Sequence, residues 1–568
     1  MATCQYLTKE KMMNVDKALE ELGSWGRFQL INYSLICLPI IFTAMFSLCY
    51  VFTAGLVPHR CLVPECDGAR PRYAEEWLAF AVPSRGEGGA PSGCLRYLAA
   101  SPAPGPPRCA PAAFSRNATA PCGRWVFEDS ETTVASEFGI ACDNEWKRTV
   151  VGTVYAIGQF IGMPIAGVVS DRIGRKTILV SGLVLVSLVG LARSMAWSYE
   201  SYLFLSFLDA VAGSGVYTSC FVLGVELVGP DRRVLAASLL SMFYAVGEAL
   251  LGALARGVRS WRRLLLAVHA PALLFASYRW MIPESVRWLT SQGREDEALD
   301  ILLKAARTNG IVLSEAVLNK PEHCALVNEE KSSICEDGSS KSSDSVFLQV
   351  LKSRILLLRF INCCFCWLAN TFVFYGLTLN SVAVGGDKYA SFVMAALAEV
   401  PGYVAAIFVM RGLGRRVGLA ASLCGSGAAV LAACFVPADL QAVRTACFMT
   451  SKLLITLSFT VLYVHTAEMF PTPLRHSAIS AGCMVGRFGS MVAPQTPLLA
   501  RYSESLPLLL LGAAAVLAGG LALLFPETLG ALLPDTVAQA ERVGRGGPDK
   551  SPLGRTASPD QGAALCGP

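Results

Sequence analysis

The sequence predicts an all-α membrane protein with twelve transmembrane helices in two six-helix bundles and a disulfide-rich extracellular loop. Three observations support this fold class. The chain has 568 residues, of which 53% are hydrophobic and only 16% charged, and its mean hydropathy is +0.47. Apolar runs of about 20 residues, enough to cross a bilayer as a helix, recur along it. The second half of the chain also repeats landmarks of the first half at matching spacings.

The chain begins with a charged amphipathic segment, residues 1–27, which we assign to the cytoplasm. The apolar run that follows is longer than the hydrophobic region of a signal peptide and lacks a small-residue cleavage site. We therefore interpret this run as a retained first span rather than a cleaved leader.

The polar segment between the first two spans, residues 56–147, is rich in Pro and Gly. An even number of cysteines in such a segment predicts a disulfide-stapled ectodomain in an oxidising compartment, and the sequence alone leaves their pairing open. Asn117 begins the tripeptide Asn-Ala-Thr and is a predicted N-glycosylation site. The six cysteines are Cys61, Cys66, Cys94, Cys109, Cys122 and Cys142.

The remaining apolar runs divide into two groups of spans, an N-terminal bundle at residues 28–282 and a C-terminal bundle at residues 355–525. A loop at residues 283–354 separates the bundles; its first part is helical and charged, and its second part is a Ser/Lys/Asp-rich linker. A polar tail occupies residues 526–568. The predicted spans are 28–55, 148–170, 177–197, 200–222, 234–255, 263–282, 355–379, 389–410, 417–436, 443–464, 476–500 and 506–525.

The cysteine-rich loop sets the predicted orientation, because disulfides form outside the cytosol. The N-terminus, the loop at 283–354 and the C-terminal tail are then cytoplasmic. Most basic loops fall inside, as the positive-inside rule expects, although the arginines between 256 and 263 would lie outside. This topology predicts a multi-pass protein of the plasma membrane, embedded in the lipid bilayer. The net charge of +5 is thinly spread and does not indicate a nucleic-acid partner.

An internal repeat predicts how the spans are arranged. Gly174 precedes Glu226 by 52 residues, and Gly414 precedes Glu468 by 54. A Pro-Glu pair then begins 57 residues after Glu226 and 58 residues after Glu468. Each landmark lies at a cytoplasmic span end. Such a parallel duplication predicts two bundles related by an axis along the membrane normal, with a binding site between them at mid-depth.

Several phrases of the sequence resemble a known family. GVVSDRIGRK at 167–176 is similar to the signature loop between spans two and three of the major facilitator superfamily. The large cysteine loop, PESVRWL at 283–289 and TAEMFP at 466–471 resemble the organic ion transporters of solute carrier family 22. AEVPGYV at 398–404 and PETLGALLPD at 526–535 are most like its organic cation/carnitine branch. The resemblance covers about residues 20–542 and implies a transporter that works by alternating access.

Charged residues at the cytoplasmic span ends are candidate gating residues, because ion pairs there can hold one state of a rocking transporter and break in the other. The alternative is that the basic residues only set the topology. We expect Glu284 and Glu527 to join the two clusters. The first-half candidates are Asp171, Arg172, Arg175, Lys176, Glu226, Arg232 and Arg233, and the second-half candidates are Arg415, Arg416, Glu468 and Arg475.

Ionisable residues inside the spans are costly and therefore need partners. They are Asp209, Glu248, Glu399, Lys452 and Arg487. Mutual pairing of these residues is one alternative, and contact with substrate is the other. The family resemblance places Arg487 and Glu399 on the translocation path. It also implies that a basic residue at position 487 accompanies anion or carnitine transport, and an arginine suits a carboxylate.

Aromatic residues could hold the other end of such a substrate, because aromatic faces attract quaternary ammonium groups. Packing between helices is the competing explanation for each ring. A zwitterion such as carnitine would place its carboxylate near Arg487 and its ammonium near aromatic residues and Glu399. The predicted substrate-binding residues are Arg487, Glu399, Tyr375, Tyr403, Phe374 and Lys452.

The sequence carries no motif for nucleotide binding, dinucleotide binding or zinc hydrolysis, and its five histidines are scattered. We therefore expect no enzyme activity, no metal and no cofactor, with transport either facilitated or coupled to sodium or protons. Two other functions stay open: an organic-anion exchanger, and a non-transporting receptor that uses the cysteine loop to bind a ligand. The sequence does not define an oligomeric state.

Overall fold

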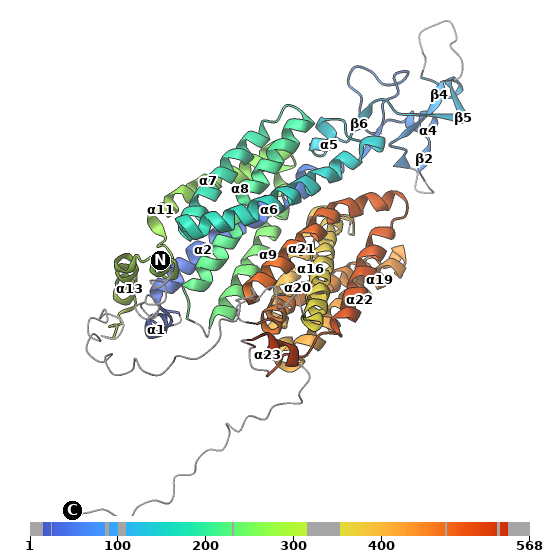
Figure 1. Ribbon diagram of the computed structural model, residues 1–568. Coiled ribbons are helices and arrows are strands. Elements are labelled where there is room, and N and C mark those ends of the chain that lie inside the picture. Colours follow the sequence, from blue (N-terminus) through green and yellow to red (C-terminus); the bar gives the residue numbers. More distant parts are fainter. Residues whose placement is uncertain are drawn as a thin grey trace, which may run out of the picture.

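The computed structural model describes residues 15–23, 25–85, 90–99, 109–229, 232–314, 353–384, 386–471, 474–530, 534 and 536–543. Figure 1 shows two groups of long helices side by side, with the strands gathered at one end. Within the described residues, ten helical stretches are long and apolar enough to cross a membrane. The fold is thus that of a multi-pass helical membrane protein.

The first bundle is built from six helical stretches of the N-terminal half. They are α2 (Arg27–Leu48) with α3 (Tyr50–Thr53), α6 (Trp146–Ile173), α7 (Arg175–Ser194), α8 (Tyr199–Glu226), α9 (Arg233–Val258), and α10 (Trp261–Ala272) with the 3-10 turn η4 (Leu273–Ser277) and α11 (Tyr278–Met281).

The second bundle follows the same plan in the C-terminal half. Its elements are α16 (Arg354–Asn380), η5 (Ser381–Ala383), α17 (Lys388–Leu397), α18 (Glu399–Gly412), α19 (Arg415–Phe435), η6 (Ala438–Leu440), α20 (Gln441–Met469), α21 (Arg475–Val492), η8 (Ala493–Arg501) and α22 (Leu506–Ala522).

Two spans of the second bundle differ from the continuous helices that the sequence predicts. The eighth is interrupted at Ala398, between α17 and α18, where Pro401 lacks the N–H that would bond to the carbonyl of Leu397. The eleventh is α-helical only to Val492 and continues as the 3-10 helix η8, which contains two prolines. The twelfth, α22, has only 17 residues, so the number of twelve spans stays a prediction.

Each bundle has its own apolar core. Small residues let the helices approach closely: a Cβ on Gly158 of α6 would lie 2.7 Å from the Phe207 carbonyl oxygen of α8, and one on Gly162 would lie 2.7 Å from that of Val211. This four-residue spacing of glycines is typical of packed membrane helices. The cores meet through Tyr389, on α17 of the second bundle, which belongs to the first bundle's core.

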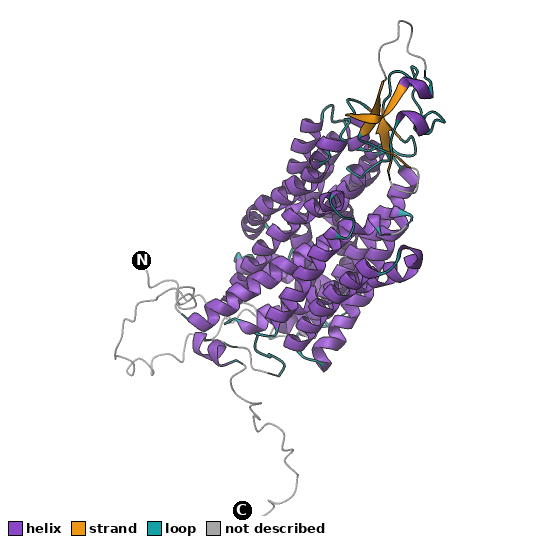
Figure 2. Ribbon diagram, turned by 90° about the vertical axis from the view of Figure 1, so that its right-hand side faces the viewer, coloured by secondary structure: helices purple, strands orange, loops and turns teal. Residues whose placement is uncertain are grey.

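The segment between α3 and α6 forms a small domain at one end of the bundles (Figure 2). Three two-stranded antiparallel sheets make up its framework. They pair β1 (His59–Cys61) with β6 (Trp125–Phe127), β2 (Ser84–Arg85) with β3 (Ala90–Pro91), and β4 (Leu95–Ala99) with β5 (Phe114–Pro121). The connections hold α4 (Leu78–Ala81), η1 (Pro111–Ala113), α5 (Val134–Glu137) and η2 (Cys142–Asn144). We call this domain the ectodomain, because the sequence predicts that it lies outside the cell.

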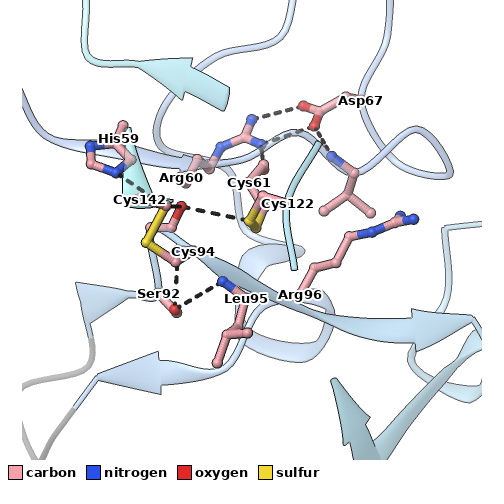
Figure 3. The surroundings of a disulfide bond; sticks show 12 residues. His59, Arg60, Cys61, Asp67, Ser92, Cys94, Leu95, Arg96, Cys122 and Cys142 are labelled. Atoms are coloured by element: carbon pink, nitrogen blue, oxygen red, sulfur yellow. Dashed lines mark hydrogen bonds and ion pairs between the residues drawn. A yellow bond between two sulfur atoms is a disulfide. The ribbon is translucent and has the colours of Figure 1, made fainter. Parts of the chain in front are cut away.

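The six cysteines of the ectodomain lie in three pairs, Cys61–Cys122, Cys66–Cys109 and Cys94–Cys142. Beside them Arg60 is fully buried and contacts Asp67 at 2.7 Å (Figure 3). His59 lies 3.9 Å from the sulfur of Cys142, but this sulfur is bonded to that of Cys94, so the three residues do not form a thiolate metal site. Asn117 is exposed on β5.

The opposite end of the bundles carries short helices, α1 (Val15–Glu21), α12 (Val286–Ser291), α13 (Glu295–Asn309) and α23 (Val537–Arg542) (Figure 1). Asn309 at the end of α13 caps the first span, since its Oδ1 accepts from the Phe28 N–H at 2.8 Å. The linker predicted after α13 and the tail after residue 543 lie outside the described residues. We refer to this end as the cytoplasmic end, following the predicted orientation.

Candidate functional site

At the cytoplasmic end of the first bundle, the predicted gating residues form a connected cluster. Glu284 accepts hydrogen bonds from the backbone N–H groups of Arg175 and Lys176, both at 3.0 Å, at the start of α7. A carboxylate suits this place because a helix N-terminus has free N–H groups and a positive dipole end. Ser285 donates to Glu226 at 2.5 Å, and Arg175 lies 2.8 Å from Asp171.

The second bundle repeats this arrangement. Glu527 accepts from the N–H groups of Arg415 and Arg416 at 2.9 and 3.0 Å, at the start of α19. Thr528 takes the place of Ser285 and donates to Glu468 at 2.6 Å. Arg415 lies 3.1 Å from Glu468. Glu284 therefore belongs to the first-half cluster and Glu527 to the second-half cluster, and their gating role stays a prediction.

In each half, the glycine that precedes the capped helix makes room for the capping glutamate. Gly174 and Gly414 have φ values of 102° and 85°, a region that favours glycine. A Cβ there would lie 2.3 Å from Glu284 Oε2 in the first half and 2.6 Å from Glu527 Oε2 in the second. Burial raises the pKa of Glu527, but four backbone N–H donors outweigh it and lower the pKa below its ordinary value.

The other gating candidates lie around these clusters. Arg172 and Arg232 are exposed, and Lys176 and Arg416 are half-buried. Arg475 donates to the Ala467 carbonyl at 2.6 Å. Arg233 begins α9, and its side chain lies outside the described part of the chain.

Contacts between the bundles gather at the ectodomain end. Glu131 binds Lys388 and also accepts from the Tyr389 hydroxyl at 2.6 Å. Thr149 donates to Gln495 at 2.8 Å, and Gln495 donates to Thr153 at 2.8 Å. The structure is thus closed at this end. Sequence reasoning missed these residues because the partners lie hundreds of positions apart and belong to no motif.

Arg487 lies on α21 at the interface between the bundles, half-buried. Its guanidinium donates to Gln159 of α6 at 3.1 Å and lies 4.0 Å from the Met163 sulfur. Among the described residues no carboxylate lies within ion-pair distance of it. Tyr375 and Tyr463 are within electrostatic range. Among the described residues, Arg487 is therefore a half-buried cation with neutral partners.

Glu399 and Lys452 form the pair that the sequence left as one alternative. Their Oε1 and Nζ atoms lie 2.8 Å apart and both side chains are fully buried. Among the described residues neither Glu399 oxygen has a hydrogen-bond partner, so the contact with Lys452 is an ion pair. Lys452 donates instead to Thr378 at 2.6 Å, and its Nζ stands 3.5 Å from the centre of the Phe374 ring.

These contacts change the expected substrate-binding set. Phe374 and Lys452 face one another and are buried, an arrangement that favours packing over contact with substrate. Tyr375 and Tyr403 are half-buried. Tyr403 lies in electrostatic range of Glu399, whereas Tyr375 lies in range of Arg487.

The first bundle contains a second buried pair. Arg193 of α7 lies 2.9 Å from Asp209 of α8, and both side chains are within 1% of full burial. The sequence analysis selected Asp209 as an ionisable residue inside a span. It did not select Arg193, because a charged residue in the last turn of a predicted span is ordinarily taken to face the membrane surface. The pair joins two helices of one bundle, so it is a packing element of that bundle.

Two repeated helical bundles, with matching clusters at one end and charged residues at their interface, define the class of secondary membrane transporters. The chain matches the family model "Sugar (and other) transporter" over residues 124–535. It belongs to this family of the major facilitator superfamily and, within it, to the organic ion transporters of solute carrier family 22.

Relatives match almost the whole chain. The "Organic cation transporter protein" of Drosophila melanogaster is 32% identical over 94% of this chain and 95% of its own length. The human "Organic cation/carnitine transporter 2" is 31% identical over the same shares. Among solved structures, a partially occluded inward-open xylose transporter XylE from E. coli has a TM-score of 0.51 at 18% identity, covering 68% of this chain and 89% of its own. That similarity concerns the fold alone.

Proposed function

We propose that this chain carries a small organic ion with a carboxylate across the plasma membrane by alternating access, and that a carnitine-like zwitterion fits best. The observation that carries the proposal is Arg487: a permanent cation, placed between the bundles, whose partners among the described residues are neutral. Such a charge is costly inside a membrane unless an anion joins it. A substrate carboxylate would supply that anion through a charge-assisted, bidentate contact.

The other end of the substrate has aromatic groups available. Tyr375 and Tyr244 lie in electrostatic range of Arg487, and Tyr403 lies next to Glu399. Half-exposed tyrosine rings can hold a quaternary ammonium group through cation–π contact. The names of two relatives, organic cation transporter protein and organic cation/carnitine transporter 2, agree with a cationic group on the substrate.

The proposal includes the predicted topology of twelve spans, with both termini in the cytoplasm and the ectodomain outside. We propose that in that orientation the bundles are closed toward the outside, where Thr149 and Thr153 of α6 bind Gln495 of η8, and that the cytoplasmic end is the open one. The clusters around Glu284 and Glu527 would then act as gating elements that rearrange when the cytoplasmic end closes.

Uptake into expressing cells tests the proposal. The probes are labelled carnitine, a tetraalkylammonium without a carboxylate and an aromatic carboxylate without an ammonium, each with and without sodium. We expect carnitine uptake that Arg487→Ala abolishes and Arg487→Lys partly keeps, at equal surface expression. Uptake of the aromatic carboxylate alone would favour an anion exchanger. Absence of all uptake, despite surface expression, would favour a receptor.

A further inference from the structure

Glu248 is a buried acid that the proposed substrate site does not use. It lies on α9 of the first bundle and is 1% exposed. Neither of its carboxyl oxygens has a hydrogen-bond partner among the described residues. The charged groups in electrostatic range of it, Glu399 and Lys452, belong to the second bundle, whose helices α17 and α18 pack against α9. The cluster of Glu248, Glu399 and Lys452 therefore spans the interface between the bundles; we call it the interface triad.

The formal charges of the interface triad do not balance. Two carboxylates and one ammonium sum to one negative charge, enclosed where all three side chains are at most 1% exposed. Lys452 is already paired with Glu399 at 2.8 Å. Among the described residues, Lys452 is the cation in electrostatic range of Glu248, so a second carboxylate beside this pair is left unbalanced there, and an isolated buried charge is strongly disfavoured.

The other groups that face Glu248 do not supply the missing charge. Tyr50 of α3, Tyr403 of α18 and Tyr244 of α9 itself are in electrostatic range, and their hydroxyls are neutral. The preceding residue, Gly247, packs against Ile41 and Ala44 of α2, which carry no charge. One turn further along α9, Gly252 packs against Phe392 and Val393 of α17, which also carry no charge.

We propose that Glu248 and Glu399 share one proton when the bundles are closed at the ectodomain end, so that the interface triad is a proton-binding site. The proton comes from water and forms one O–H bond on a carboxylate oxygen, which changes the charge of the triad from −1 to 0. Two adjacent carboxyl groups that hold a single proton are a known arrangement in proteins.

The location of the triad links this proton to the transport cycle. Glu248 and Glu399 come from different bundles, so separating the bundles at the ectodomain end parts the two carboxyl groups and admits external water. Glu248 then loses the neighbour that favours its protonation, and the proton can dissociate. Closure at this end therefore requires a proton. This step rests on the proposed alternating access, whereas the shared proton in the closed state does not.

Infrared spectroscopy of the full chain in lipid nanodiscs tests the shared proton directly. At neutral pH the C=O stretching band of a protonated carboxylic acid, identified by its shift in D2O, is expected in the wild type. Glu248→Gln and Glu399→Gln should each remove it, because each leaves one carboxylate and one ammonium. Lys452→Met should increase it, since two carboxyl groups then need two protons. Glu468→Gln is the control and should leave the band unchanged, because Glu468 pairs with Arg415.

Uptake as a function of external pH tests the coupling. Uptake of labelled carnitine by the wild type should rise as external pH falls, and Glu248→Gln, which is neutral at every pH, should lose this dependence. A band that persists in both glutamine variants, or is absent from the wild type, would overturn the proton site. If no probe is transported but the infrared pattern holds, the proton site stands and the proposed function fails.

Discussion

The two halves of the chain agree at their cytoplasmic ends and differ in the charged residues that are buried inside the bundles. At the cytoplasmic ends, Glu284 and Glu527 each accept from two N–H groups of the helix that follows a left-handed glycine. Inside the bundles, the first half pairs Arg193 of α7 with Asp209 of α8, whereas the second half pairs Lys452 of α20 with Glu399 of α18, and this second pair also has Glu248 of the first bundle in electrostatic range. The repeated contacts of Glu284 and Glu527 hold helix ends together. The charged residues without a counterpart in the other half supply the charges of the candidate site.

The largest effect is expected from breaking the two buried ion pairs, Arg193–Asp209 and Lys452–Glu399. Asp209→Asn leaves the arginine charged and buried without its acid, and breaking such a pair costs about 3–5 kcal/mol. Glu399→Gln should cost less, because Glu248 is in range to pair with Lys452. Thermal unfolding of the purified proteins measures both.

A paired replacement is the control for this experiment. Arg193→Met combined with Asp209→Leu removes both charges and should recover most of the lost stability. An equal loss of stability in Asp209→Asn and Glu399→Gln would contradict the difference between the bundles.

The repeated clusters should respond alike. Glu284→Ala and Glu527→Ala each remove an acceptor of two backbone N–H groups, which should lower stability by about 1–3 kcal/mol. Glutamine at either position keeps an acceptor and should restore part of the loss. Unfolding temperatures of the four variants check this, and a large loss in only one half would show that the clusters are not equivalent.

A smaller effect is expected at the ectodomain end. Glu131→Gln weakens the link between the ectodomain and Lys388 and Tyr389 of the second bundle, by about 0.5–1.5 kcal/mol. The open fraction at this end should rise accordingly. The readout is labelling of Val393→Cys, which faces Gly252 across the interface, by a membrane-impermeant thiol reagent. Glu128→Gln in the same background is the control, and equal labelling in both would exclude the role of Glu131.

The smallest effect concerns pH at the cytoplasmic end. Because the pKa of Glu527 is lowered in the folded state, its stabilisation is complete above the ordinary glutamate pKa and disappears as pH falls through the lowered value. The difference in unfolding temperature between wild type and Glu527→Gln should therefore shrink in acid. A difference that does not change with pH would contradict the ionised cap.

Sequence reasoning recovered the family and the repeat, because both depend on local phrases and their spacing. It also found Glu399 and Lys452, since charges inside apolar runs are conspicuous. It could not find Gln159 or Glu131, which are ordinary polar residues until the fold places them against Arg487 and Lys388. The break at Ala398 was likewise missed, although Pro401 was a local signal for it.

The central claim is that Arg487 holds the carboxylate of the substrate. Direct binding of carnitine and of its methyl ester to the purified protein isolates this contact, because the ester keeps the ammonium and masks the carboxylate. The wild type should prefer carnitine by about tenfold to a hundredfold, as a charge-assisted contact of about 1.5–3 kcal/mol implies. Arg487→Ala should bind both compounds equally weakly. If Arg487→Ala still prefers carnitine to its ester, another group binds the carboxylate and the account is wrong.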